Sequence, residues 1–319
     1  MKKKLALIAF AMVVLVGVLM LPVGGEAHSA TQDRVKGMDL SSFPATKPSQ
    51  PLRLLFIHHS VGGQWLADPG PQADLADSIH PTHPNGGGLR KALEAEGYEV
   101  SEASYGSAIG EDTDLFHWLP KFKGDMGRIL KTKFNDQVHS GSELNQIVMF
   151  KSCYPNSRFQ SMGKAPGNAQ GPELSVWNAK ATLTAMLDVF SQYPNILFVY
   201  ITAPPNAPKY GSEPLLKVLA KKLLGKPNTD EVMARQASLA RTFNNWVQSP
   251  NGWLKDYPHH NAVSFDFYDV LTEGGASNFS RYPTGNGDDS HPARAGQQKA
   301  TAAFVPFLNR AVHRAGLAQ

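Results

Sequence analysis

The stretch that decides the fold is "LRLLFIHHSVGG", residues 52 to 63. Five of its first six residues are apolar, and the run ends abruptly in two histidines, a serine and two glycines. A nearly continuous apolar run of this length is typical of a strand buried on both faces of a parallel sheet. Ligands of open α/β sheets bind at the carboxyl ends of such strands. The stretch therefore predicts a buried strand that presents polar, reactive groups at its end.

Four further apolar runs share this character. They are residues 98–103, 146–150, 196–201 and 262–267. Helical patterns lie between and after the runs, at residues 88–96, 173–193, 230–247 and 295–315. The alternation predicts an α/β fold, a three-layer α/β/α sandwich around a five-stranded parallel sheet. Right-handed crossovers and a crevice between the first and third strands predict the flavodoxin-like order 2-1-3-4-5.

The N-terminus has the pattern of a bacterial secretory signal. Three lysines precede a long apolar run, and Gly25-Glu26-Ala27 has the small-x-small form of a cleavage site. We interpret residues 1–27 as a signal peptide, with an uncleaved membrane anchor as the alternative. Residues 28–51 contain three prolines and no periodicity, which predicts a linker or an arm lying on the main domain, residues 52–319. The expected location is secreted or periplasmic, with membrane contact only through an uncleaved N-terminal segment.

Charge and cysteine content exclude some classes of protein. The formal charge of the 319-residue chain is +4, and residues 1–27 hold three lysines and one glutamate, so the remainder carries only +2. Such a small excess gives no argument for a nucleic-acid partner. The one cysteine, Cys153, cannot form an internal disulfide. With Lys151 as its nearest charged neighbour, it is also a less attractive nucleophile than Ser60.

A serine hydroxyl reacts as a nucleophile only with a base beside it and an acid that orients the base. The segment "GNGDDSHPARAG", residues 285–296, follows the fifth apolar run. Within it Asp288 and His291 are three residues apart, so one turn lets the carboxylate bind one imidazole nitrogen. The other nitrogen is then free to take the proton of Ser60. Each feature alone is ambiguous, because strand-end serines are commonly turn residues and loop histidines are commonly surface groups.

Two further segments offer hydrogen-bond donors for a negatively charged oxygen. Asn156 follows the third apolar run in "SCYPNS", where its amide is either an oxyanion donor or part of a proline-containing turn. Gly110 follows the second run, and its backbone N–H is our first choice for a second donor. Gly106 is the alternative.

This order of motifs resembles the SGNH (GDSL-like) hydrolase superfamily over nearly the whole chain after the arm. The resemblance implies that Ser60 is the nucleophile, His291 the base and Asp288 the orienting acid. It also implies an oxyanion hole made by the N–H groups of Ser60 and Gly110 and by the side chain of Asn156. The family's Gly-Asp-Ser is replaced here by His58-His59-Ser60, and its Gly-x-Asn-Asp by residues 154–157. Whether His59 takes over the hydrogen bonds of the missing aspartate or adds a second base stays open.

The resemblance implies a secreted serine esterase, a carboxylic-ester hydrolase without a cofactor, that forms an acyl-enzyme on Ser60. We expect small acyl groups such as acetyl to be removed from a carbohydrate or a similar ester, either a small molecule or a polysaccharide. Four side chains are expected to border the substrate: His59, Trp65, Tyr105 and Tyr154. One alternative is an acyltransferase that uses the same serine to acylate a polysaccharide. Another is a non-catalytic carbohydrate-binding protein on the same fold.

A metal site is a further alternative, because the chain offers many imidazoles. The candidate ligands are His58, His59, His80, His83, His259, His260 and Asp289. No pair of these histidines has the four-residue spacing of a helical zinc motif, and no cysteine completes a set. We therefore expect no metal.

The segment of residues 206–228 interrupts the alternation after the fourth strand. It contains an amphipathic helix, Leu215–Leu224, that carries Lys217, Lys221 and Lys222. One interpretation is a lid over the crevice or a docking surface for an anionic polymer. The other is a helix whose lysines simply form its solvent-exposed face. In both cases the segment is expected near the carboxyl ends of the strands.

Overall fold

A computed structural model describes residues 39–318. The expected signal, residues 1–27, and the first part of the arm lie outside these residues. The rest of the arm, residues 39–51, contains no helix or strand. It is hydrogen-bonded to the final helix, α9 (Arg294–Arg314), and buries the side chain of Leu40.

The main sheet has seven strands in the order β6-β5-β4-β1-β7-β8-β9. Their bounds are β1 Leu52–Ile57, β4 Tyr98–Ala103, β5 Thr132–Phe134, β6 Gln137–Val138, β7 Ile147–Lys151, β8 Leu197–Ile201 and β9 Ala262–Phe265. All neighbouring pairs are parallel except β5 and β6. The expected count of five is therefore wrong. The two additional strands, β5 and β6, are only three and two residues long, too short to produce a pattern in the sequence.

β1 pairs with β4 on one side and with β7 on the other. At its carboxyl end Ile57 lies beside both Ala103 and Phe150, the last or nearly last residues of their strands. The ends of three adjacent parallel strands thus meet at one edge. Ser60 lies at that edge because only two residues separate it from the end of β1.

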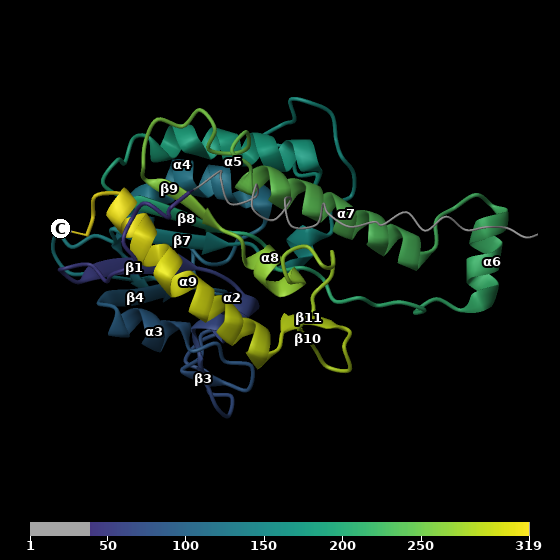
Figure 1. The fold of residues 1–319 in the computed structure, drawn as a ribbon, viewed down its shortest axis with the longest axis horizontal. Helices are drawn as coiled ribbons and strands as arrows, with labels where there is room; N and C mark the ends of the chain where they lie inside the picture. The colour runs from purple at the N-terminus through teal and green to yellow at the C-terminus, as the bar shows by residue number, and fades with distance from the viewer. Residues whose placement is uncertain (1–38, 319) are drawn as a thin grey trace, which may run out of the picture.

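Two layers of helices cover the sheet, as Figure 1 shows. The α-helices of the described residues are α2 Ser60–Leu66, α3 Leu89–Ala95, α4 Leu115–Lys131, α5 Val176–Phe190, α6 Leu215–Leu223, α7 Thr229–Gln248, α8 Phe267–Thr272 and α9, and all but α6 lie against the sheet or its ends (Figure 1). One core packs α4, α5 and α7 against side chains such as Leu55 and Ile57. The other packs α2, α3 and α9 against Leu54 and Phe56. Alternate residues of β1 thus enter opposite cores, which explains its nearly continuous apolar sequence.

α4 is a helix that we did not predict from the sequence, because Pro120 and two glycines interrupt the pattern. Its buried residues nevertheless recur at helical spacing, from Leu115 and Trp118 to Phe122 and Met126. This spacing continues past the proline and is the pattern in the sequence that indicates the helix.

α6 differs from the other long helices because it has no buried residue. Figure 1 places it beyond the end of α7, away from the sheet. Within residues 39–318, no helix has both the length and the apolar character needed to cross a membrane.

Candidate active site

Three side chains form a hydrogen-bonded series at the carboxyl edge of the sheet. Ser60 Oγ lies 3.0 Å from His291 Nε2. On the other side of the imidazole, Nδ1 lies 2.8 Å from Asp289 Oδ1. With Nδ1–H donating to the carboxylate, Nε2 is the nitrogen that accepts from the serine hydroxyl. The order of these contacts is the one that a serine nucleophile needs.

The acid in this series is Asp289, and the expectation of Asp288 is wrong. Residues Asp289–Pro292 form strand β11, which pairs with β10 (Pro283–Thr284). The turn expected for this segment is therefore absent. In an extended strand residues i and i+2 project from the same face, so the Asp289 side chain lies beside that of His291. The Asp288 carboxylate instead lies 3.5 Å from Lys209 Nζ.

Asp289 also holds the backbone of its partner, because His291 N–H donates to Oδ1 at 3.0 Å. Partial burial raises the pKa of Asp289, but the hydrogen bonds and charge of His291 and a hydrogen bond from Thr284 together outweigh burial, and the net pKa is lowered. Asp289 is therefore a carboxylate near neutral pH, as required to stabilise a positive charge on the imidazole.

The first histidine of the opening motif, His58, is a buried structural residue. Its Nε2 lies 3.0 Å from a carboxylate oxygen of Glu102 on β4, and its Nδ1 lies 3.0 Å from the carbonyl oxygen of His59. Glu102 is in turn paired with Arg90 of α3. A side chain at Gly62 would clash with this ring, because its Cβ would lie 2.3 Å from His58 Cβ. Gly62 is thus required by the protein's own packing.

The second histidine, His59, holds the loop that follows β4. Its Nε2 lies 2.8 Å from the carbonyl oxygens of both Gly110 and Glu111, so this nitrogen carries the proton. The ring stacks on Tyr105 with a centroid separation of 3.6 Å. Burial lowers the pKa of His59 to about 4. Near neutral pH it is therefore a neutral imidazole that donates to the loop after β4.

Neither expected glycine offers a backbone N–H to an oxyanion. Gly110 N–H donates to Ser107 Oγ at 2.9 Å, and Gly106 N–H donates to Glu111 Oε2 at 2.7 Å. The expectation for Gly110 is wrong for this reason. A Cβ at Gly110 would lie 2.1 Å from the Ser104 carbonyl oxygen, so close packing accounts for this glycine.

Asn156 lies in a short 3₁₀ helix, Tyr154–Ser157, directly after β7. Its Oδ1 accepts from the N–H of Leu115 at 2.8 Å, and its Nδ2 donates to Asp114 Oδ1 at 2.7 Å. The amide therefore ties this turn to the start of α4. An amide nitrogen has two hydrogens, and this bond uses one of them.

The four side chains expected at the substrate have different positions. Trp65 is fully buried in the core and donates to Thr301, so its assignment to the substrate is wrong. Tyr154 packs edge-on against His291, with ring centroids 5.2 Å apart. Tyr105 and His59 stack on each other beside the Ser60 turn. The sequence could not separate these cases, because a single aromatic residue has the same pattern in a core and at a site.

A pocket of about 500 Å³ lies beside Ser60. Its other lining residues are Gln64, Gln72, Asp74, Ala76, Asp77, Ser78, His80 and His83. His80 Nδ1 lies 2.6 Å from Asp74, and this hydrogen bond lowers the pKa of Asp74. Gly63 lets the loop approach α2, because a Cβ there would lie 1.8 Å from the carbonyl oxygen of Ser78. We did not predict this wall, since it is an irregular loop with no motif.

The many histidines do not converge. Among residues 39–318, no three His, Cys, Asp or Glu side chains are grouped as metal ligands. His80 and His83 lie in the pocket wall with ring centroids 5.1 Å apart, whereas His58 is paired inside the sheet.

Cys153 is close to the serine, with Sγ 3.7 Å from Ser60 Oγ. It is buried and follows β7, whose last residue, Lys151, is also fully buried. Burial lowers the pKa of Lys151. The imidazole of His291 is hydrogen-bonded to Ser60, so Cys153 is a suitable position for a control variant.

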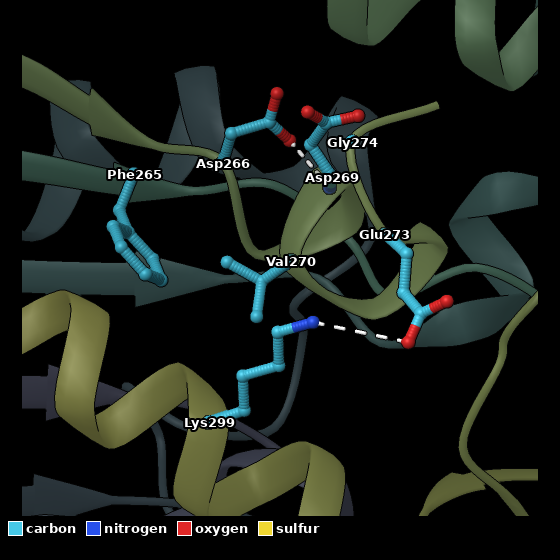
Figure 2. Close-up of a pocket in the computed structure, with 7 residues that line it drawn as sticks. All are labelled: Phe265, Asp266, Asp269, Val270, Glu273, Gly274 and Lys299. Carbon is cyan, nitrogen blue, oxygen red and sulfur yellow. Dashed lines mark hydrogen bonds and ion pairs between the residues drawn. The ribbon is translucent and has the colours of Figure 1, made fainter. Parts of the chain in front are cut away.

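A second pocket, of about 430 Å³, lies where β9 meets α8 and α9 (Figure 2). Its acidic groups are already engaged: Asp269 pairs with Arg241 at 2.5 Å, and Glu273 lies 3.9 Å from Lys299. Asp266 accepts hydrogen bonds from the Asp269 N–H and from Thr202. The pocket contains no serine or histidine, so it lacks the groups for acyl transfer.

Asp266 gives a prediction about stability. Burial and the nearby Asp269 raise its pKa to about 7, above the value of an unfolded aspartate. The folded chain then binds more protons than the unfolded chain between about pH 4 and 7, so the contribution of Asp266 to stability falls as pH rises through that window. Asp266→Asn keeps a side chain that can cap α8 and removes this dependence. We expect the Tm of this variant, taken relative to that of the wild type, to be several degrees higher at pH 8 than at pH 5.

Thermal melts at both pH values test this expectation, with Asp256→Asn as the control at an exposed carboxylate. The control should differ from the wild type equally at both pH values. An Asp266→Asn variant that is less stable at pH 8 would show that the ionised carboxylate is favourable in the folded chain.

No protein-family model and no curated protein match the chain. Among solved structures, an acetylxylan esterase from Geobacillus stearothermophilus is 13% identical with a TM-score of 0.42, covering 85% of this chain and 97% of that one. A carbohydrate esterase family 2 enzyme with a carbohydrate-binding domain, from Corynascus thermopiles, is 14% identical with a TM-score of 0.37, covering 84% and 68%. Likenesses this distant assign no function.

Proposed function

We propose that this chain is an exported serine esterase of the SGNH type that removes small acyl groups from a carbohydrate or a similar ester. The single observation that carries the proposal is the series Ser60–His291–Asp289, with separations of 3.0 and 2.8 Å. A hydroxyl, an imidazole and a carboxylate in this order and at these distances are the parts of nucleophilic acyl transfer.

In the proposed reaction Ser60 Oγ attacks the ester carbonyl carbon while its proton moves to His291 Nε2. The tetrahedral intermediate collapses, the bond to the alcohol oxygen breaks, and His291 returns the proton to that oxygen. Water then attacks the acyl-Ser60 carbonyl while His291 takes one of its protons. The bond between the acyl carbon and Ser60 Oγ breaks, His291 returns the proton to Oγ, and the acid is released. Asp289 keeps the imidazole in the required tautomer and stabilises its charge in both steps.

The negative oxygen of the intermediate needs hydrogen-bond donors. Ser60 is the first residue of α2, where backbone N–H groups have no partner within the helix, so its own N–H is available. The second amide hydrogen of Asn156 is the other proposed donor. Gly110 has no part in this proposal because its N–H is bound to Ser107.

The character of the pocket supports an alcohol rich in hydroxyl groups. Its wall next to Ser60 carries two carboxylates, Asp74 and Asp77, together with Gln72 and His80. Carboxylates, amides and imidazoles bind hydroxyl groups, whereas a long acyl chain needs an apolar channel. A small acyl group and a sugar alcohol fit these surroundings. Tyr154, packed on His291, is the proposed aromatic neighbour of the substrate.

A fluorophosphonate probe tests the nucleophile, because it phosphonylates only serines activated by a base. We expect the label on the peptide that contains Ser60, none on the Ser60→Ala variant and unchanged labelling of Cys153→Ala. A carbohydrate-binding protein without activity would leave the wild type unlabelled, which would refute the proposal. Acetate release from an acetylated oligosaccharide in water then separates hydrolysis from acyl transfer, in which the acetyl group would appear on an added sugar.

A further inference from the structure

The most exposed apolar surface of the described chain belongs to α6. Of ten exposed large hydrophobic side chains among residues 39–318, five lie within residues 215–224. Four of these, which we call the leucine stripe, have exposures of 57% to 89%: Leu215, Leu216, Leu219 and Leu223. At 100° per residue they fall within an arc of about 100° on one side of the helix. Scattered exposed leucines are ordinary, but a continuous stripe indicates a partner.

The polar side of α6 is the side that is tied to the rest of the chain. Glu213, just before the helix, lies 2.6 Å from Lys221 Nζ and 3.4 Å from Lys217 Nζ. The same carboxylate accepts from the N–H and hydroxyl of Thr229, the first residue of α7, both at 3.1 Å. The hydrogen bond from Lys221 lowers the pKa of Glu213 to about 2, so the carboxylate stays charged. The helix is thus held by its charged side with the leucine stripe outward, the reverse of a helix packed on a core.

The charge around the stripe is of one sign. Residues 214–228 contain four lysines and no aspartate or glutamate. Lys222 lies at the edge of the stripe on the helical wheel, and Lys226 follows the helix; both are exposed. A short amphipathic helix with a leucine face and lysine flanks matches a helix that lies in the surface of a bilayer with anionic lipids.

Other occupants fit less well. A nine-residue helix is only ~14 Å long. A stable contact with a second copy needs ~800 Å² on each side, and pairing two stripes would bring like-charged lysines together. An anionic polysaccharide would satisfy the lysines but leave the leucines in water.

We propose that α6 binds this protein to anionic membranes, with the leucine stripe entering the boundary between headgroups and acyl chains and Lys222 and Lys226 contacting lipid phosphates. The contact is separate from any anchor at the N-terminus, and it does not depend on esterase activity.

A fluorophore attached within the stripe tests the proposal in the full-length chain. In a Cys153→Ala background, Leu219→Cys is labelled with nitrobenzoxadiazole, and emission is recorded with vesicles of phosphatidylcholine alone or with ~30% phosphatidylglycerol. We expect a blue shift and brighter emission with the anionic vesicles only. The matched control, Leu75→Cys, labels another exposed leucine and should not shift, even if the N-terminus holds the chain on the same vesicles.

Second variants test the two halves of the surface. Leu216→Glu with Leu223→Glu should reduce the vesicle-induced signal at position 219 by at least about tenfold, and Lys222→Gln with Lys226→Gln should remove its dependence on anionic lipid. α6 buries no residue, so the melting temperature should not change. The proposal is overturned by no shift with anionic vesicles, by an equal shift with neutral vesicles, or by a shift without vesicles. If that last shift grows with protein concentration, the partner is a second copy; if it follows addition of an acetylated sugar, α6 is a lid.

Discussion

Replacing Ser60 by alanine is expected to lower kcat for p-nitrophenyl acetate by about 10⁴-fold or more, to the level of a blank. The hydroxyl lies 3.0 Å from His291 Nε2, and no acyl-enzyme can form without it. The same loss is expected for acetate release from an acetylated oligosaccharide. Initial-rate assays on the purified variant measure the loss of kcat. A thermal melt checks the fold. We expect it to be intact, because the variant loses only one hydroxyl group from a half-buried side chain.

Cys153→Ala is the matched control for that variant. Its sulfur lies 3.7 Å from Ser60 Oγ, so the change removes the nearest other nucleophile at the same edge of the sheet. We expect kcat to stay within about threefold of the wild type. If Cys153→Ala is inactive while Ser60→Ala retains turnover, the thiol is the nucleophile and the proposed mechanism is wrong.

Asp289→Asn is expected to lower kcat by about 10²- to 10⁴-fold, because the imidazole loses the carboxylate that fixes its tautomer and stabilises its charge. The carboxylate makes two contacts with His291, one to the ring at 2.8 Å and one to the backbone at 3.0 Å. Kinetics on the purified variant near neutral pH measure the loss. We expect the loss mainly in kcat, because Asp289 acts through the histidine and not on the substrate.

The neighbouring residue provides the control for this prediction. Asp288→Asn makes the same chemical change one position earlier, where the carboxylate faces Lys209 at the surface. We expect its kcat to change by less than about threefold, since surface ion pairs contribute little. A larger loss from Asp288→Asn than from Asp289→Asn would mean that the imidazole is oriented by Asp288 in solution.

Much of the architecture is readable in the sequence because buried parallel strands need apolar side chains on both faces. The five apolar runs are strands of the main sheet, and the helical patterns at residues 173–193, 230–247 and 295–315 correspond to α5, α7 and α9. Patterns of this kind are local and repeat along the chain. By contrast, β5 and β6 are set by their pairing with each other and with β4, and two or three residues carry no readable period.

The site shows the same division. That a serine after β1 and a histidine after β9 belong together was implied by the resemblance of the motif order to the SGNH superfamily. It agrees with the geometry of parallel strands, whose carboxyl ends meet at one edge. Which carboxylate reaches the histidine was not, because it depends on whether residues 288–291 form a turn or a strand. Pairing with β10 makes them a strand, and an extended backbone places Asp289 and His291 on one face.

The remaining assignments depended on individual contacts, one of them local and one between segments distant in the sequence. The N–H of Gly110 is consumed by Ser107, and Trp65 is enclosed by the core on α9. The sequence by itself determined the layered α/β class and the position of Ser60 at its edge, since both follow from local periodicity. Only the tertiary structure decided which donors and acids remain free to act, because a hydrogen bond made elsewhere removes a group from the site, and no local pattern records that loss.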